Sequence, residues 1–328
     1  MMSPTIPVVE TRGLVKRYGD QLAVAGVDLI VGPGEIYGLV GPNGAGKTTM
    51  MKILATLLSQ TAGEAYVTGI PVDADPIEVR RRIGYMPDFY GVYDDLRVWE
   101  YLDFFARCYG VPANRRATMI GELLEIVGLT EKRDSYVETM SRGMRQRLCL
   151  AHTLVHDPAL LILDEPASGL DPRARVELRE IMRELRAMGK TILISSHILP
   201  ELGEMCTGVA IIDHGRVLRS GSIHEIERSL RATALLRIDL LGDESAVTAA
   251  REWLGTDSRI ADVLEGTTNG DGAVRIEASF DGTPDAQADL LRAMVAAGHR
   301  VVGFSQATSD LEEIFLKVTG QTTGEVAA

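Results

Sequence analysis

The sequence predicts an α/β domain, with a largely parallel sheet covered by helices, followed by a small α+β domain. A glycine-rich run joins a short apolar strand to a helix after residue 40, and further β-rich runs (LILDE, KTILISS, GVAIIDHG) alternate with longer helical patterns. Near residue 232 the sequence pattern changes to one of short predicted strands and helices. We therefore expect one domain over residues 8–230, a second over residues 233–320, and a flexible tail over residues 321–328.

The bulk composition excludes several classes of function. Hydrophobic residues make up 45% of the 328 residues and the formal net charge is −12, which argues against nonspecific nucleic-acid binding as the main task. No apolar run approaches the ~20 residues that cross a bilayer, and no secretory signal is evident. The three cysteines lie far apart without metal-binding spacing, so we expect them to be reduced in a cytosolic protein.

The first element that carries chemistry is a phosphate-binding loop. Glu35–Val40 has the pattern of a buried strand and Thr49–Leu58 that of a helix, and the pattern G-x-x-x-x-G-K-[ST] lies between them. Glycines leave backbone N–H groups open to phosphates, and the helix N-terminus adds its positive end. We expect Lys47 to reach the β- and γ-phosphates and the Thr48 hydroxyl to contact Mg²⁺. The expected nucleotide contacts are Gly41, Pro42, Asn43, Gly44, Ala45, Gly46, Lys47, Thr48 and Thr49.

A helical segment precedes the next strand that carries candidate catalytic residues. Trp99–Thr153 contains almost only helical patterns, which predicts a helical subdomain over about residues 95–155. The apolar strand that follows, Leu160–Pro166 (LLILDEP), resembles a Walker B motif. Asp164 would hold Mg²⁺, directly or through water, and Glu165 would act as general base on the attacking water. Two carboxylates that serve only solubility are the alternative, against which the combination with the phosphate-binding loop argues.

The C-terminal region predicts a ferredoxin-like α+β order. Strands and helices are expected at Leu235–Leu240, Asp243–Leu254, Ala273–Phe280, Asp285–Ala297, Arg300–Gln306 and Asp310–Val318. The run Gly266–Gly272 (GTTNGDG) is a turn candidate. No catalytic cluster is evident in this region.

The run Met140–Arg147 (MSRGMRQR) resembles the signature motif of ABC transporter ATPases, whose usual form is L-S-G-G-Q. Ser141 and Gly143 stand in their expected places, shortly before the Walker B-like strand. Ser141 would cap a helix whose free N–H groups face a γ-phosphate. In this family the motif closes over ATP that a second cassette holds.

Three further motifs follow the order of that family. Ser168–Asp171 (SGLD) resembles the D-loop, which places Asp171 among the nucleotide contacts. His197, in the run ISSHIL, resembles the switch histidine that contacts the γ-phosphate. Tyr18, in the run KRYG, resembles the aromatic residue that stacks on adenine. The resemblance covers about residues 8–230. It implies a P-loop NTPase fold of the ABC cassette type, with ATP and Mg²⁺ as ligands and catalytic roles for Lys47, Glu165 and His197.

Two places depart from the family pattern. The Q-loop position after the run IGYMP is Asp88 instead of Gln. A carboxylate is still a hard oxygen ligand, so we expect Asp88 to contact Mg²⁺ together with Thr48 and Asp164. The signature has Arg142 for its first Gly and Met144 for its Gln. Neither change removes the helix N-terminus, and we expect hydrolysis to persist.

The end of the chain resembles ATPases of the type-two ABC export family. Ser309–Gly320 (SDLEEIFLKVTG) is similar to the C-terminal end of the accessory domain in these ATPases. Pro87–Gly110 also resembles the corresponding segment of the type-two export family. The resemblance implies an exporter subunit that pairs with a second cassette, as a homodimer, and with separate integral-membrane permease subunits. Such a subunit is cytoplasmic, on the inner face of the cell membrane, with no direct nucleic-acid contact. A coupling helix of the permease would dock near Pro87–Gly110. The alternative is that the aromatic residues of this segment pack in the core.

Other interpretations stay open. Soluble ABC ATPases that act on nucleic acid or ribosomes usually carry two cassettes or a long coiled-coil insertion, and the sequence has neither. A non-hydrolysing regulatory cassette is motivated by Asp88 and the altered signature, but the intact set Lys47, Asp164, Glu165 and His197 opposes it. A GTPase would need an N-K-x-D motif to recognise guanine, and the sequence has no such motif. The transported substrate and the role of the C-terminal domain stay undetermined by the sequence.

Overall fold

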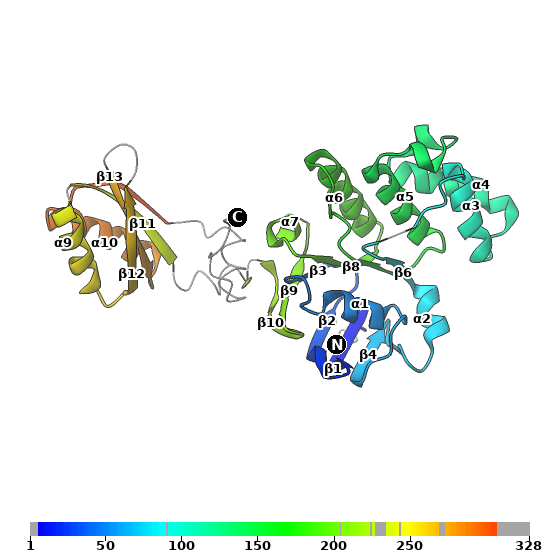
Figure 1. The fold of residues 1–328 in the computed structure, drawn as a ribbon, viewed down its shortest axis with the longest axis horizontal. Coiled ribbons are helices and arrows are strands. Elements are labelled where there is room, and N and C mark those ends of the chain that lie inside the picture. Colours follow the sequence, from blue (N-terminus) through cyan, green and yellow to red (C-terminus); the bar gives the residue numbers. More distant parts are fainter. Residues whose placement is uncertain are drawn as a thin grey trace, which may run out of the picture. The chain divides into compact units, whose positions relative to one another are not determined.

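The computed structural model describes two compact units, divided between Ile223 and His224 (Figure 1). The described residues are 6–89, 91–203, 205–223, 225–226, 234–242, 244–268 and 273–306. The expected helix Asp310–Val318 and the tail over residues 321–328 lie outside them, as do the last four residues of the turn candidate Gly266–Gly272. In the part of the chain that is described, no helix is both long and apolar enough to span a membrane.

A six-stranded sheet forms the centre of the first unit. Its strand order is β10-β9-β3-β8-β7-β6, with all neighbours parallel except β10 and β9. Every residue of β3, β7 and β8 is buried, as expected for parallel strands covered on both faces. The bounds are β3 Ile36–Val40, β6 Ile83–Met86, β7 Leu160–Leu163, β8 Thr191–Ser196, β9 Gly208–Asp213 and β10 Arg216–Gly221.

A second, antiparallel sheet in this unit was not foreseen from the sequence. Its order is β2-β1-β4-β5, with β1 Val9–Tyr18, β2 Gln21–Val31, β4 Ala62–Val67 and β5 Ile70–Pro71. The helix α1 (Lys47–Leu54) lies between the two sheets, and residues of both sheets and of α1 share one hydrophobic core (Figure 1). The helix α1 is shorter than the expected Thr49–Leu58, and the left-handed φ of 60° at Thr56 follows its end.

The segment between β6 and β7 is helical. Ser141 caps α5, because its hydroxyl accepts a hydrogen bond from the Met144 N–H at 3.3 Å. The helix α6 that follows β7 is capped in the same way by Asp171, whose carboxylate accepts from the Ala174 N–H at 2.8 Å. The helices of this unit are α2 Pro76–Arg82, α3 Val98–Cys108, α4 Ala113–Ile126, α5 Arg142–Leu154, α6 Pro172–Ala187 and α7 Leu199–Gly203, with 3₁₀ turns at Thr130–Lys132 and Val137–Thr139.

The second unit has the element order β-α-β-β-α-β. Its antiparallel sheet has the order β12-β13-β11-β14, and one face packs against α9 and α10 through Leu236, Ile238, Leu254 and Leu290, among others. The strand β12 was not among those expected from the sequence. The bounds are β11 Ala234–Leu241, α9 Glu244–Gly255, β12 Ile260–Thr268, β13 Ala273–Phe280, α10 Pro284–Ala296 and β14 Val301–Gln306.

Candidate nucleotide-binding site

The glycine-rich loop connects the end of β3 directly to the first residue of α1. Gly44 and Gly46 have φ values of 83° and 106°, in the region that favours glycine. A Cβ at Gly41 would overlap the carbonyl oxygen of Ile212, and one at Gly46 would overlap that of Ala23. The glycines are therefore required by the close approach of neighbouring backbone as well as by the turn, and α1 presents its N-terminal N–H groups to the loop.

This loop lines a cavity of about 270 Å³. Tyr18 at the end of β1, Asp88 after β6 and Glu165 after β7 also line it, so three segments far apart in sequence meet the loop. Gln21 and Ala23 from β2 complete the wall, and neither was predicted from the sequence. The cavity therefore brings together most of the residues that were expected to contact nucleotide.

The ammonium group of Lys47 is held at the floor of this loop. It donates to the carbonyl oxygens of Gly41 at 2.5 Å and Pro42 at 3.2 Å. It also lies 3.4 Å from Oε1 of Glu165, and both side chains of this pair are largely buried. A cation at this depth, beside the N-terminus of α1, makes the loop a site for polyanions such as phosphates.

Asp164 directly follows β7, does not line the cavity itself and is only 1% exposed. Its Oδ1 accepts a hydrogen bond from the Ser195 hydroxyl at 2.7 Å, while its Oδ2 is buried without a hydrogen-bond partner. Burial raises the pKa of Asp164, and hydrogen bonds from the side chains of Ser195 and Thr48 lower it in part. An unpartnered carboxylate oxygen beside a threonine hydroxyl, with the Asp88 carboxylate on the cavity wall, is a set of hard oxygen donors that fits Mg²⁺.

Glu165 has a left-handed backbone with φ of 49°, which is rare for a residue with a side chain. Its N–H donates to the Ser195 hydroxyl at 2.8 Å, which holds this turn at the end of β7. Its Oε2 lies 2.8 Å from Nδ1 of His197. The switch-like histidine therefore touches the carboxylate expected to act as base, and the Ser195 hydroxyl bridges Asp164 and the backbone of Glu165. The role of Ser195 was missed, although two serines before the histidine in a buried strand are an unusual pattern.

The signature residues form a second cluster that does not line this cavity. Ser141 and Gly143 lie at the start of α5, whose first turn has no acidic residue. Gly143 faces the start of α6, because a Cβ added there would come within 3.2 Å of the Ala174 Cβ. Asp171 directs its carboxylate to the N–H of Ala174 in the same place. Within one chain, the signature and D-loop residues are therefore grouped together, apart from the phosphate-binding loop.

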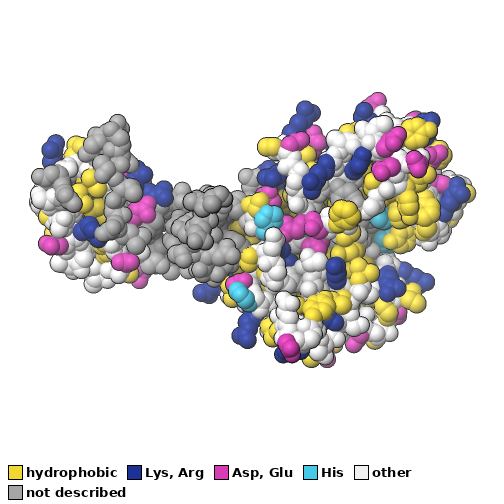
Figure 2. Space-filling model, in the orientation of Figure 1, with side chains coloured by type: hydrophobic (Ala, Val, Ile, Leu, Met, Phe, Trp, Pro, Cys, Tyr) yellow, Lys and Arg dark blue, Asp and Glu magenta, His cyan; other side chains and the backbone are white. Residues whose placement is uncertain are grey.

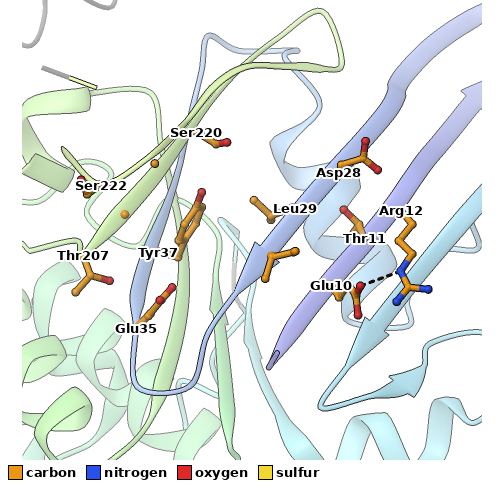
Figure 3. A pocket seen from close by; sticks show the side chains of 13 residues that line it. Glu10, Thr11, Arg12, Asp28, Leu29, Glu35, Tyr37, Thr207, Ser220 and Ser222 are labelled. Atoms are coloured by element: carbon orange, nitrogen blue, oxygen red, sulfur yellow. Dashed lines mark hydrogen bonds and ion pairs between the residues drawn. The ribbon is translucent and has the colours of Figure 1, made fainter. Parts of the chain in front are cut away.

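A larger cavity, of about 660 Å³, lies elsewhere in the first unit (Figure 3). The carboxylates of Glu10, Asp28 and Glu35 line it, against the single guanidinium of Arg12, which is paired with Glu10 at 2.8 Å. Burial, and then the charge of Glu35, raise the pKa of Tyr37 to about 12, so this phenol stays neutral. Because the wall is negative overall, this cavity would repel a triphosphate, and the smaller cavity is the better nucleotide site.

Exposed aromatic side chains occur directly after Asp88 in the sequence, before α3 and on α3 itself. Phe89 is 91% exposed and follows Asp88, while Tyr93 and Phe104 are half exposed and pack edge to face with ring centres 5.6 Å apart. Tyr101, by contrast, is only 1% exposed and belongs to the core. Hydrophobic side chains are frequent over the helical part of this unit in Figure 2. We call Phe89, Tyr93 and Phe104 the aromatic surface.

The comparisons with known proteins agree with this geometry. Residues 24–168 match the family model described as ABC transporter. The chain is 35% identical to the Nod factor export ATP-binding protein I of Burkholderia orbicola (strain AU 1054), over 97% of this chain and 98% of that protein. It is 38% identical to the daunorubicin/doxorubicin resistance ATP-binding protein DrrA of Streptomyces peucetius, over 95% of this chain and 92% of that protein. A solved structure described as the ATP binding subunit of an ABC transporter matches with a TM-score of 0.62 at 32% identity, over 68% of this chain and 93% of that one.

Proposed function

The chain belongs to the ABC transporter family, among the export ATP-binding proteins, and we propose that it hydrolyses Mg-ATP to drive export through separate membrane subunits. One observation carries the hydrolytic part of this proposal. The Glu165 carboxylate lines the cavity of the phosphate-binding loop, between the ammonium of Lys47 and the imidazole of His197. A carboxylate in this position can take a proton from a water molecule that attacks a bound γ-phosphate.

Each group in the cavity then has a definite task. Lys47 and the N–H groups of the loop bind the β- and γ-phosphates, and Tyr18 stacks on the adenine. Thr48, Asp164 and Asp88 are the residues that would hold Mg²⁺, which supplies charge neutralisation for the phosphates. Nδ1–H of His197 donates to Glu165 and orients its carboxylate.

The signature cluster completes the site in a homodimer. Ser141, Gly143 and Asp171 do not line the cavity of their own chain, and the first turn of α5 contains no acidic residue. A second copy that places these residues over bound ATP would supply the missing wall of the site. ATP binding then closes the dimer, and hydrolysis with product release reopens it.

The aromatic surface is the site at which we place the membrane partner. Phe89 is almost fully exposed and adjoins Asp88 in the nucleotide cavity, so a helix that docks there would sense the state of the nucleotide. The protein would thus work on the cytoplasmic face of the membrane through protein contacts. Its relatives are named for Nod factor and for daunorubicin/doxorubicin, and the cargo of this chain is set by its own permease subunits.

Two measurements test the proposal. Purified protein should release phosphate from ATP only with Mg²⁺, whereas a regulatory cassette without turnover would bind ATP and release none. Light scattering on the Glu165→Gln variant should give a monomer without nucleotide and a dimer with Mg-ATP. A chain that binds ATP, shows no turnover and stays a monomer would contradict the hydrolytic homodimer.

A further inference from the structure

Arg142 is the first residue of α5 and replaces a glycine of the usual signature. Its side chain is directed toward the loop before α6 and does not line the nucleotide cavity of its own chain. The guanidinium donates a hydrogen bond to the carbonyl oxygen of Ser168 at 3.0 Å. Ser168 begins the D-loop, Ser168–Asp171, so the side chain of one interface motif reaches the backbone of another.

Gly169 makes this contact possible. A Cβ at this position would overlap the guanidinium carbon and both terminal nitrogens of Arg142, so the guanidinium lies directly on the Gly169 backbone. The φ of 66° at Gly169 also requires glycine. The planar guanidinium can lie against a backbone in this way and donate from its edge, which an ammonium group cannot do.

Other contacts hold the same two segments together. Gly143 lies so close to α6 that an added Cβ would be 3.2 Å from the Ala174 Cβ and 3.5 Å from a methyl of Leu170. The Ser168 N–H donates to the Glu165 carbonyl oxygen at 3.0 Å, which ties the start of the D-loop to the expected base. Arg142 therefore closes a chain of contacts that runs from α5 through the D-loop to Glu165.

We propose that Arg142 is a positioning residue that fastens the D-loop to the start of α5, so that both segments meet the second cassette as one preformed surface. This inference rests on the proposed function, because it assumes that these segments form the dimer interface. Ordering a loop on association reduces affinity, and a loop that is already held in the monomer avoids that loss. The substitution in the signature thus aids closure of the dimer, and its charge is not the main contribution.

The test compares dimer formation in the Glu165→Gln background, with Mg-ATP, by light scattering or analytical ultracentrifugation. Arg142→Gly restores the usual signature glycine and should raise the dimer dissociation constant about tenfold, because two loops per dimer must then be ordered on closure. ATP affinity of the monomer should stay unchanged. Arg183→Ala, on the middle of α6, removes one positive charge elsewhere and should have no effect.

Arg142→Lys distinguishes the hydrogen-bonded contact of Arg142 with the D-loop from a simple effect of its positive charge. It keeps the positive charge but loses the planar group, so it should behave like Arg142→Gly. Two results together would overturn the positioning role in favour of electrostatic attraction between the two copies. Arg142→Lys would form dimers as well as the parent, and Arg142→Gly would dimerise as well as the parent at high salt. Gly169→Ala strains the backbone in either background, but its methyl group overlaps a side chain only when Arg142 is present. It should therefore weaken dimer formation more in the protein that keeps Arg142 than in Arg142→Gly.

Hydrogen exchange on the monomer gives an independent readout. The amides of the D-loop should exchange faster in Arg142→Gly than in the parent protein, and equal exchange rates would overturn the proposal. If the Glu165→Gln parent fails to dimerise with Mg-ATP, the homodimer of the proposed function fails. The exchange rates of the monomer still decide whether Arg142 holds the loop.

Discussion

Lys47 and Glu165 form an ion pair across the nucleotide cavity, with Nζ and Oε1 3.4 Å apart. Lys47 follows β3 and Glu165 follows β7, so the pair joins the two motifs to which we assign ATP binding and hydrolysis. A phosphate that enters the loop competes with Glu165 for the ammonium group. We therefore expect nucleotide binding also to release the carboxylate, which would then be free to accept a proton from water.

Glu165→Gln should separate binding from turnover. The amide keeps the shape of the side chain but cannot act as a base, so we expect phosphate release to fall at least about 100-fold. ATP affinity should be equal or higher, because the competitor for Lys47 loses its charge. Phosphate-release kinetics and calorimetric titration with ATP measure the two effects.

The matched control is Glu180→Gln, because Glu180 lies on the exposed face of α6, where it pairs with Arg183. It should leave both quantities unchanged. Normal turnover of Glu165→Gln would remove Glu165 from the role of general base.

Lys47→Ala should remove most of the affinity for ATP. The ammonium group is the buried cation of the loop, and charge-assisted contacts to phosphates are among the stronger polar interactions, so we expect the dissociation constant to rise roughly tenfold or more. Lys52 is on the same helix and is exposed, so Lys52→Ala provides the control. Equal ATP affinity of the two variants, measured by titration with a fluorescent ATP analogue, would contradict the assignment of the loop.

Asp164→Asn should stabilise the nucleotide-free protein at neutral pH. Burial raises the pKa of Asp164 in the folded protein, so the folded state binds a proton more tightly than the unfolded state does. Stability from this group is present at low pH and is lost as the pH rises through the folded pKa. The neutral asparagine still accepts the hydrogen bond from Ser195 and avoids the buried charge.

The unfolding temperature, measured between about pH 4 and pH 8 without nucleotide, tests this prediction. The advantage of Asp164→Asn should be greatest at the upper end and should shrink toward the lower end. The variant should also lose the extra stabilisation that Mg²⁺ gives to the ATP complex of the parent. A variant that is less stable than the parent at pH 8 would show that Asp164 is not strained by burial.

The motifs with local causes were predictable from the sequence. The pattern of residues 41–49 is typical of a phosphate-binding turn, because its glycines and its Lys47 stand at the fixed spacings of such a turn. The Walker B-like strand predicted at Leu160–Pro166 is an apolar run that ends in charge, and its first four residues form a fully buried strand, β7, with both carboxylates directly after it. These features depend on a few neighbouring residues, which is why a single sequence is sufficient.

Features that depend on which strands are neighbours could not be predicted. Ser195 reaches Asp164 because β8 lies beside β7 in the sheet, and the sequence does not state this order. The hairpin of β1 and β2 is the clearest omission, since it supplies Tyr18, Gln21 and Ala23 to one cavity. The position of Arg142 against Gly169 likewise requires the packing of α5 on the loop before α6.

Tyr18→Ala should weaken binding of the base while leaving the phosphates untouched. Tyr18 ends β1, lines the nucleotide cavity and is 46% exposed, so its ring is accessible to adenine. Stacking of a base on an aromatic ring contributes about 1–3 kcal/mol, which corresponds to a loss of roughly 5- to 150-fold in ATP affinity. Tyr18→Phe keeps the ring and should bind ATP like the parent.

Inorganic tripolyphosphate is the control ligand, because it has the charges of the ATP tail and no base. It should bind equally to the parent and to Tyr18→Ala, since Lys47 and the loop are unchanged. Lys16 lies with its ammonium group 5.2 Å from the Tyr18 ring centre, and it stays in both variants. If Tyr18→Ala loses equal affinity for ATP and for tripolyphosphate, the substitution disturbs the loop. The proposal that adenine stacks on Tyr18 would then be wrong.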